Sequence, residues 1–93
     1  MEVIAVCGFG VGSSMLLKMS IDKAFRALGR SEEAMNLDLI SGKSQKCDCI
    51  FTSPQIAEDL REEVKVPVYA VNKYMDVAEV TEVLKQAIAD LGL

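Results

Sequence analysis

Cys7 stands between a short apolar run, residues 3–6, and a glycine-rich segment that reads Gly8-Phe9-Gly10-Val11-Gly12-Ser13-Ser14. Alternate glycines allow positive φ angles, so successive backbone N–H groups can point into one concavity that binds an anion. A helical apolar pattern begins at Met15, and the N-terminus of a helix adds its positive dipole end to such a site. These surroundings favour a thiolate, which is a soft nucleophile. The spacing therefore predicts that a phosphoryl group becomes covalently attached to Cys7.

Other phosphate-binding segments fit the same residues less well. A dinucleotide-binding loop needs a third glycine where this chain has Ser13, and a triphosphate loop needs Gly-Lys-Ser/Thr, which is absent. A cysteine-dependent phosphatase also uses a cysteine at a strand end, but it carries an arginine six residues later, and Ser13 stands at that position. Without the guanidinium, the phosphoryl oxygens lack a bidentate clamp. A low-molecular-weight phosphatase, a thiol reductase and a regulatory module that holds a phosphorylated ligand remain the alternatives.

The segment from Ile4 to Met19, IAVCGFGVGSSMLLKM, resembles the active-site segment of the cytoplasmic IIB components of bacterial sugar phosphotransferase systems, most closely the ascorbate-type branch. The resemblance implies that residues 1–93 form a single IIB-type domain, that Cys7 is the catalytic residue, and that no cofactor is needed. It implies a phosphate-binding loop made of Gly8, Phe9, Gly10, Val11, Gly12, Ser13 and Ser14. Cys7 would accept phosphate from a phosphohistidine on a IIA partner. It would donate that phosphate to a sugar, L-ascorbate or a related small sugar acid or polyol, bound by a membrane IIC partner.

The residue composition suits transfer better than hydrolysis. An imidazole leaves a phosphohistidine without the strong acid that an ester oxygen needs. The chain contains no histidine, so no evident base activates water against a thiophosphate, and the phosphoryl group is expected to be handed on. Phe9 and Val11 alternate with the loop glycines and Met15 follows them. We expect these three apolar residues to contact the partners in short-lived complexes.

The elements that position this site alternate between strand and helix, which predicts a parallel sheet. Strands are expected at residues 2–6, 35–39, 49–52 and 66–71. The first helix is expected to be capped by Ser13 or Ser14 and ended by Gly29. Ser53-Pro54 opens the next helix, and Asp76 with Glu79 forms a capping box for the last one.

The expected fold is a small doubly wound α/β domain whose four-stranded parallel sheet has the order 2-1-3-4 and helices on both faces. Pro67 cannot donate a ladder hydrogen bond, which favours an edge position for the fourth strand. Ligands of such folds bind beyond the carboxyl ends of the strands. Thr52, Ser53 and Asn72 follow two of these strands, so their polar side chains could converge on the rim that holds Cys7, although ordinary capping and turn roles also explain them.

Composition narrows the functional classes further. The chain has 93 residues, 51% of them apolar, and a formal charge of −4, which disfavours nucleic-acid binding. No stretch approaches the roughly 18 consecutive apolar residues of a membrane span, and a cytoplasmic location is expected. Three cysteines argue against a disulfide framework, and with no histidine a zinc site would lack a fourth ligand. Cys47 and Cys49 are therefore interpreted as packed residues of one strand.

Overall fold

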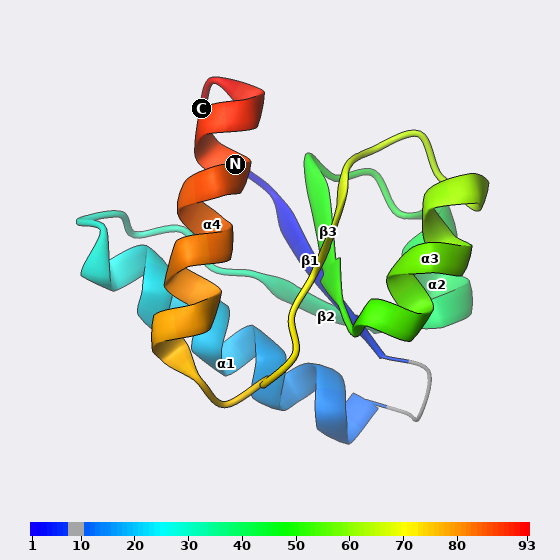
Figure 1. The fold of residues 1–93 in the computed structure, drawn as a ribbon, viewed down its shortest axis with the longest axis horizontal. Helices are drawn as coiled ribbons and strands as arrows, with labels where there is room; N and C mark the ends of the chain where they lie inside the picture. Colours follow the sequence, from blue (N-terminus) through cyan, green and yellow to red (C-terminus); the bar gives the residue numbers. More distant parts are fainter. Residues whose placement is uncertain (8–10) are drawn as a thin grey trace.

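The computed structural model of this chain describes residues 1–7 and 11–93, with the side chains of residues 11–13 excepted. In chain order its elements are β1 (Val3–Cys7), α1 (Val11–Ala27), β2 (Met35–Asp38), α2 (Leu39–Ser44), β3 (Cys49–Thr52), α3 (Pro54–Glu63), β4 (Val68–Ala70) and α4 (Val77–Leu91). The four strands form one parallel sheet in the order β2-β1-β3-β4 (Figure 1). The predicted fold class and strand order are confirmed.

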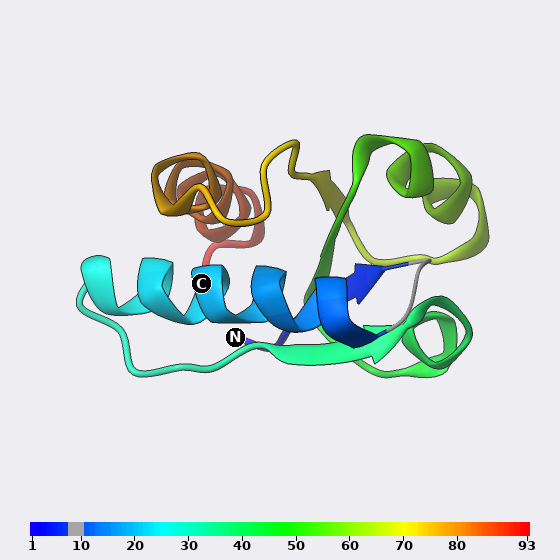
Figure 2. The ribbon, with the colours of Figure 1, turned by 90° about the horizontal axis from the view of Figure 1, so that it is seen from below.

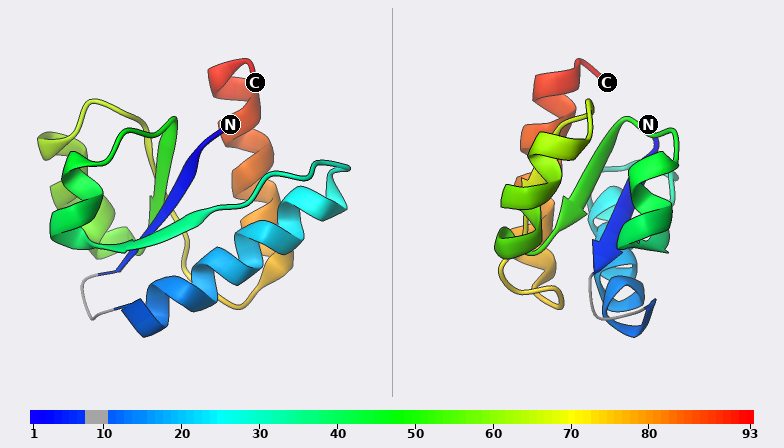
Figure 3. Two further views of the ribbon diagram at one scale, coloured as in Figure 1. Left: turned by 180° about the vertical axis from the view of Figure 1, so that it is seen from behind. Right: turned by 90° about the vertical axis from the view of Figure 1, so that its right-hand side faces the viewer.

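Two apolar clusters lie on the two faces of the sheet because successive strand side chains point to opposite faces. Val3 and Ala5 of β1 pack with α1 and α4, whereas Ile4 and Val6 pack with α3. The ribbon shows α1 and α4 together on one side of the strands and α2 and α3 together on the other (Figures 1 and 2). The right-hand view of Figure 3 looks onto the α2 and α3 side. The sheet is thus covered on both faces, which explains the continuous apolar sequence of β1.

Helix α1 begins at Val11, four residues before the apolar pattern that indicated it. Ser13 and Ser14 lie inside the helix, so the prediction that one of them caps its start is wrong. The predicted end is confirmed. Gly29 has a φ of +76°, its N–H donates to Arg26 O at 3.0 Å, and the N–H of Arg30 donates to Phe25 O at 2.8 Å. This is the Schellman arrangement, which requires a left-handed residue that glycine adopts without strain.

The second strand ends at Asp38, and Leu39, which was expected in the strand, begins the short helix α2. The Asp38 carboxylate accepts the N–H of Ser41 at 2.9 Å and so caps the helix. An aspartate that bonds its own downstream backbone competes with continued strand pairing. Cys47 also differs from its prediction, since it lies half-buried in the connection that follows α2, and only Cys49 lies in a strand.

The second half of the chain follows its local signals closely. Ser53 caps α3 by accepting the N–H of Ile56, and Pro54 is the first helical residue. Asp76 caps α4 by accepting the N–H of Glu79 at 3.2 Å. The Glu79 carboxylate accepts from Asn72 and Lys73 instead of Asp76, so only half of the predicted capping box forms. Strand β4 is an edge strand as expected, but it is shorter than predicted and begins after Pro67.

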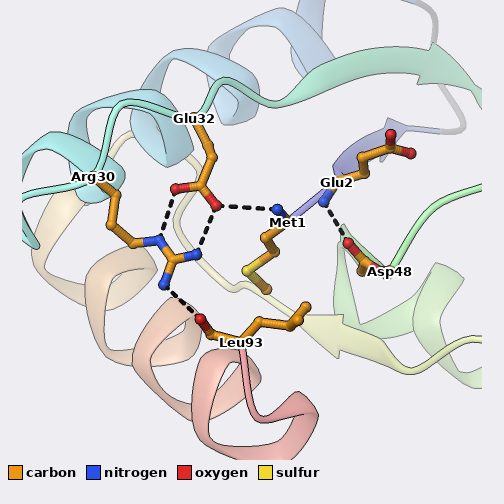
Figure 4. Close-up of polar contacts among 6 residues, drawn as sticks. All are labelled: Met1, Glu2, Arg30, Glu32, Asp48 and Leu93. Atoms are coloured by element: carbon orange, nitrogen blue, oxygen red, sulfur yellow. Dashed lines mark hydrogen bonds and ion pairs between the residues drawn. The ribbon is translucent and has the colours of Figure 1, made fainter.

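A polar cluster holds the two chain ends together near the start of β1 (Figure 4). Arg30 binds Glu32 through two N–H groups, each 2.7 Å from a carboxylate oxygen, and its third nitrogen donates to Leu93 O at 3.2 Å. The amino group of Met1 lies 3.1 Å from Glu32 Oε2. The hydrogen bond from Arg30, more than any other contact, lowers the pKa of Glu32 to about 2. This cluster lies at the opposite end of β1 from Cys7.

Within the described ranges, no helix has the length and apolar character needed to cross a membrane.

Candidate active site at the carboxyl end of the sheet

Cys7 is the last residue of β1 and is only 3% exposed. The alternation along the strand places it on the same face as Val3 and Ala5, toward α1 and α4. Its partner in the sheet register is Asp38, at the end of β2. Open α/β sheets bind ligands at this rim, next to the point where the strand order reverses, and β1 is the strand at that point.

The predicted phosphate-binding loop lies only partly within the described residues. Gly8, Phe9 and Gly10 lie outside them, as do the side chains of Val11, Gly12 and Ser13. The backbone from residue 11 onward forms the first turn of α1, and Ser14 is fully buried there. The first four N–H groups of a helix have no partner within it, so the start of α1 has donors of the kind that bind anions.

Thr52 and Ser53 reach the rim from the end of β3. The hydroxyl of Thr52 is buried and donates to Val6 O at 2.8 Å, which ties the last residues of β3 to β1 next to Cys7. The hydroxyl oxygen of Ser53 caps α3. Asn72 is exposed, and its N–H donates to Glu79 Oε2 at 2.6 Å. Thr52 thus contacts β1 and Ser53 caps α3, whereas the contact of Asn72 with Glu79 is made by its backbone N–H.

Tyr74 was not anticipated from the sequence. It lies in the loop between β4 and α4, and Ser53, Cys7 and Thr52 are among the groups that influence its pKa. Burial, above all, raises its pKa. Its carbonyl oxygen accepts the hydroxyl of Ser20 at 2.5 Å. The sequence indicated its location only through its place after the fourth strand, since every loop that follows a parallel strand begins at this rim.

The other two cysteines occupy different surroundings. Cys49 lies at the start of β3, paired in register with Val3, at the far end of the sheet from Cys7. Burial raises the pKa of Cys49 to about 12, and it also raises the pKa of Cys47, with a further contribution from Asp48. A thiol with a raised pKa is a poor nucleophile near neutral pH, so neither is suited to the chemistry expected of the site.

The described residues hold no group of three or more Cys, Asp or Glu side chains that could bind a metal ion. Two cavities among the described residues lie away from Cys7. One of about 200 Å³ is lined by residues that include Glu2, Met35 and Lys46, and one of about 340 Å³ lies between the ends of α1 and α4, beside Leu28 and Ile88. The candidate site at the rim thus consists of Cys7 and the start of α1.

A strand-end cysteine followed by a helix N-terminus on an open parallel sheet is an arrangement suited to cysteine-based phosphoryl transfer. The chain belongs to the family described as PTS system, Lactose/Cellobiose specific IIB subunit, which matches residues 2–86. It is 28% identical over 90 residues to the ascorbate-specific PTS system EIIB component of Mycoplasma pneumoniae, with 95% of each chain covered.

A solved structure agrees with the fold. The lactose-specific IIB component domain of the phosphoenolpyruvate:carbohydrate phosphotransferase system from Streptococcus pneumoniae superposes with a TM-score of 0.61 at 17% identity, over 98% of this chain and 93% of that one. IIB components transfer phosphate to sugar and work with IIA and membrane IIC partners. The chain is therefore a phosphoryl-relay component of a sugar uptake system, and the phosphatase and reductase alternatives are not supported.

Proposed function

We propose that Cys7 is the residue that carries the phosphoryl group, within a IIB-type domain formed by residues 1–93. The observation that supports this most is its position. Cys7 ends β1 at the rim where α1 begins, whereas Cys49 is buried at the other end of the sheet and Cys47 lies in a connection. Cys7 is thus the cysteine placed next to an anion-binding helix end.

The proposed reaction has two transfers through one sulfur. The thiolate of Cys7 attacks the phosphorus of a phosphohistidine on the IIA partner, so an S–P bond forms as the N–P bond breaks and the imidazole nitrogen keeps the electron pair. In the second transfer a sugar hydroxyl attacks the same phosphorus, the sulfur leaves as a thiolate, and the hydroxyl proton is released to solvent. The segment from Gly8 to Ser14 binds the phosphoryl oxygens, since backbone N–H groups directed at developing charge lower the barrier.

Apolar residues on α1 supply a surface for the protein partners. Met15, Leu16 and Met19 are 45%, 41% and 49% exposed, and they lie in the first half of α1, on the Cys7 side of the molecule. We propose that this α1 patch, together with Phe9 and Val11, contacts the IIA and IIC partners. An apolar area of this kind beside a reactive residue suits complexes that form and separate in each cycle.

The proposed sugar is L-ascorbate or a related small sugar acid or polyol, and the proposed location is the cytoplasm. The ascorbate-specific relative, similar over nearly the full length of both chains, supports this choice. The family description names lactose and cellobiose instead, and the solved structure is of a lactose-specific domain. A disaccharide is therefore the competing substrate.

Reconstituted transfer tests the proposal. Membrane vesicles that contain the IIC partner are supplied with the phosphorylated IIA partner and this protein, and each candidate sugar is assayed for phosphorylation. Ascorbate should be phosphorylated in preference to lactose and cellobiose, and Cys7→Ser should abolish the reaction while Cys47→Ser preserves it. Transfer to a disaccharide alone would overturn the substrate, and activity in Cys7→Ser would overturn the acceptor.

A further inference from the structure

The register between β1 and β3 stops before Cys7, since it ends at Ala5 of β1. Successive carbonyl groups of a strand point to opposite neighbouring strands. The carbonyl oxygen of Glu2 accepts the N–H of Cys49 at 3.4 Å, so the carbonyl of Val6, four residues further on, also points toward β3. A donor at the end of β3 can therefore hold the last peptide of β1.

The side chain of Thr52 provides this donor. Its hydroxyl donates to the carbonyl oxygen of Val6 at 2.8 Å, and both residues are fully buried. A carbonyl oxygen can only accept, so the direction of this hydrogen bond is certain. Because a buried carbonyl oxygen without a donor is costly, the hydroxyl of Thr52 holds the end of β1 in place.

Thr52 is itself held by the other half of the sheet. Its carbonyl oxygen accepts the N–H of Val71 at 2.8 Å, and it pairs in register with Ala70 of β4. As a β-branched residue it has few allowed χ1 angles. The hydroxyl therefore has a fixed position relative to β3 and β4.

The peptide that Thr52 holds is the one that leads into Cys7. The carbonyl oxygen of Val6 and the backbone nitrogen of Cys7 belong to one planar peptide unit. Fixing that plane fixes the bonds from which the Cα atom and the side chain of Cys7 extend. Cys7 is only 3% exposed, so a small rotation of the plane changes the direction of the sulfur at the rim.

We propose that Thr52 is a positioning residue for Cys7, whose hydroxyl fixes the peptide between Val6 and Cys7 and thereby directs the sulfur at the phosphorus of the donor. This inference rests on the proposed role of Cys7 as phosphoryl acceptor. Thr52 keeps its proton in both transfers, since that proton is donated to the carbonyl oxygen of Val6. A misplacement of about 1 Å between reacting groups lowers a rate by up to about 100-fold.

The test compares Thr52→Val, which removes the hydroxyl and keeps the branched shape, with Thr52→Ser, which keeps the hydroxyl. Transfer from a phosphorylated IIA partner is measured in single turnovers at increasing donor concentration, and the modified peptide is identified by mass. In Thr52→Val the maximal rate should fall about 10- to 100-fold. The donor concentration that gives half of the maximal rate should stay the same, because the buried Thr52 offers no surface to the partner. Thr52→Ser should stay within about 3-fold of the wild type, since its hydroxyl can make the same hydrogen bond.

Thr81→Val is the matched control. The hydroxyl of Thr81 also donates to a carbonyl oxygen, that of Val77 at 2.6 Å, but this hydrogen bond lies within α4. Its loss should leave the maximal rate unchanged. Circular dichroism checks that each variant is folded at the temperature of the assay.

A maximal rate equal to that of the wild type in folded Thr52→Val would overturn the inference, as would an equal loss in Thr52→Ser or in Thr81→Val. If Thr52→Val does not fold, Thr52→Ala takes its place with the same expected loss. Failure of both variants to fold would mean that the hydroxyl serves the fold first, and would also overturn the inference.

The modified peptide separates this inference from the proposed function. A wild-type phosphoryl group on a residue other than Cys7 would overturn the proposed function, and the inference with it. A phosphoryl group on Cys7 together with an undiminished rate in Thr52→Val would overturn the inference alone.

Discussion

Gly42 packs against the strand that carries Cys7, and Gly42→Ala should destabilise the fold although alanine is the better helix former. A Cβ at this position in α2 would lie 2.7 Å from Val6 Cγ2. Ordinary carbon contacts lie at about 3.5–4.0 Å, so the two groups must separate by about 1 Å. Val6 is fully buried and, as a β-branched residue, has a stiff χ1 angle, so it cannot turn aside.

The two opposing contributions are of similar size but not equal. Overpacking a core by one carbon costs about 1–3 kcal/mol, and replacing glycine by alanine within a helix gains about 1 kcal/mol. We expect a net loss of about 1 kcal/mol in the free energy of unfolding, which lowers the melting temperature of a domain this size by about 4–8 °C. Thermal and denaturant unfolding of Gly42→Ala, Val6→Ala and the double variant measure it.

The double variant should show favourable coupling, because the smaller side chain at position 6 makes room for the new methyl group. A Gly42→Ala protein as stable as the wild type, or more stable, would refute the packing argument. Purely additive effects in the double variant would place the cost elsewhere than at Val6.

Two further predictions follow from the shifted titrations. Because burial raises the pKa of Cys49 to about 12, iodoacetamide at pH 8 should leave Cys49 unmodified in the folded protein. The same reagent should label Cys49 when guanidinium unfolds the protein. Labelling of Cys49 in the folded protein would contradict this prediction. Glu32 has its pKa lowered from 4.5 to about 2, so its contact with Arg30 contributes stability above the unfolded value, and this contribution is lost as the pH falls from about 4.5 toward 2. Glu32→Gln should therefore lower the free energy of unfolding by up to about 1 kcal/mol at pH 7. Between about pH 4.5 and 2 the variant should lose less stability than the wild type in unfolding experiments. An equal loss in both proteins would contradict the lowered pKa of Glu32.

Local signals predicted most of the fold because they act over a few residues. The alternating strands, the Ser53 and Asp76 caps and the end of α1 at Gly29 each depend on neighbours within one turn. The start of α1 could not be predicted from such local signals. Gly12 lies inside the helix although glycine costs about 1 kcal/mol there, and the apolar periodicity that indicated a helix begins only at Met15.

The unpredicted helix α2 depends on a contact distant in sequence. It has six residues, one of them Gly42, and its buried face forms by the close approach of Gly42 to Val6. Six residues are too few for a periodic pattern, and isolated helices of that length are unstable in water. Only the packed structure explains why the chain turns at Asp38 instead of extending the strand through Leu39.

The candidate site also has residues that local sequence signals predict and residues that they do not predict. Cys7 could be identified from its own surroundings, since the strand, the glycines and the helix are consecutive in the sequence. Thr52 and Ser53 could be placed at the rim from topology alone. Tyr74 could not, because its position depends on the path of the loop after β4 and on the Ser20 hydroxyl that donates to its carbonyl oxygen.

The most direct test of the account is the site of phosphorylation. The protein is incubated with a phosphorylated IIA partner, and the intact mass and the modified peptide are measured for the wild type, Cys7→Ser and Cys47→Ser. The wild type and Cys47→Ser should gain one phosphoryl group of about 80 Da, located on Cys7, and Cys7→Ser should gain none, since a hydroxyl without a base is a poor nucleophile. A phosphoryl group that persists in Cys7→Ser, or that maps to Ser13 or Ser14 in the wild type, would contradict the central claim.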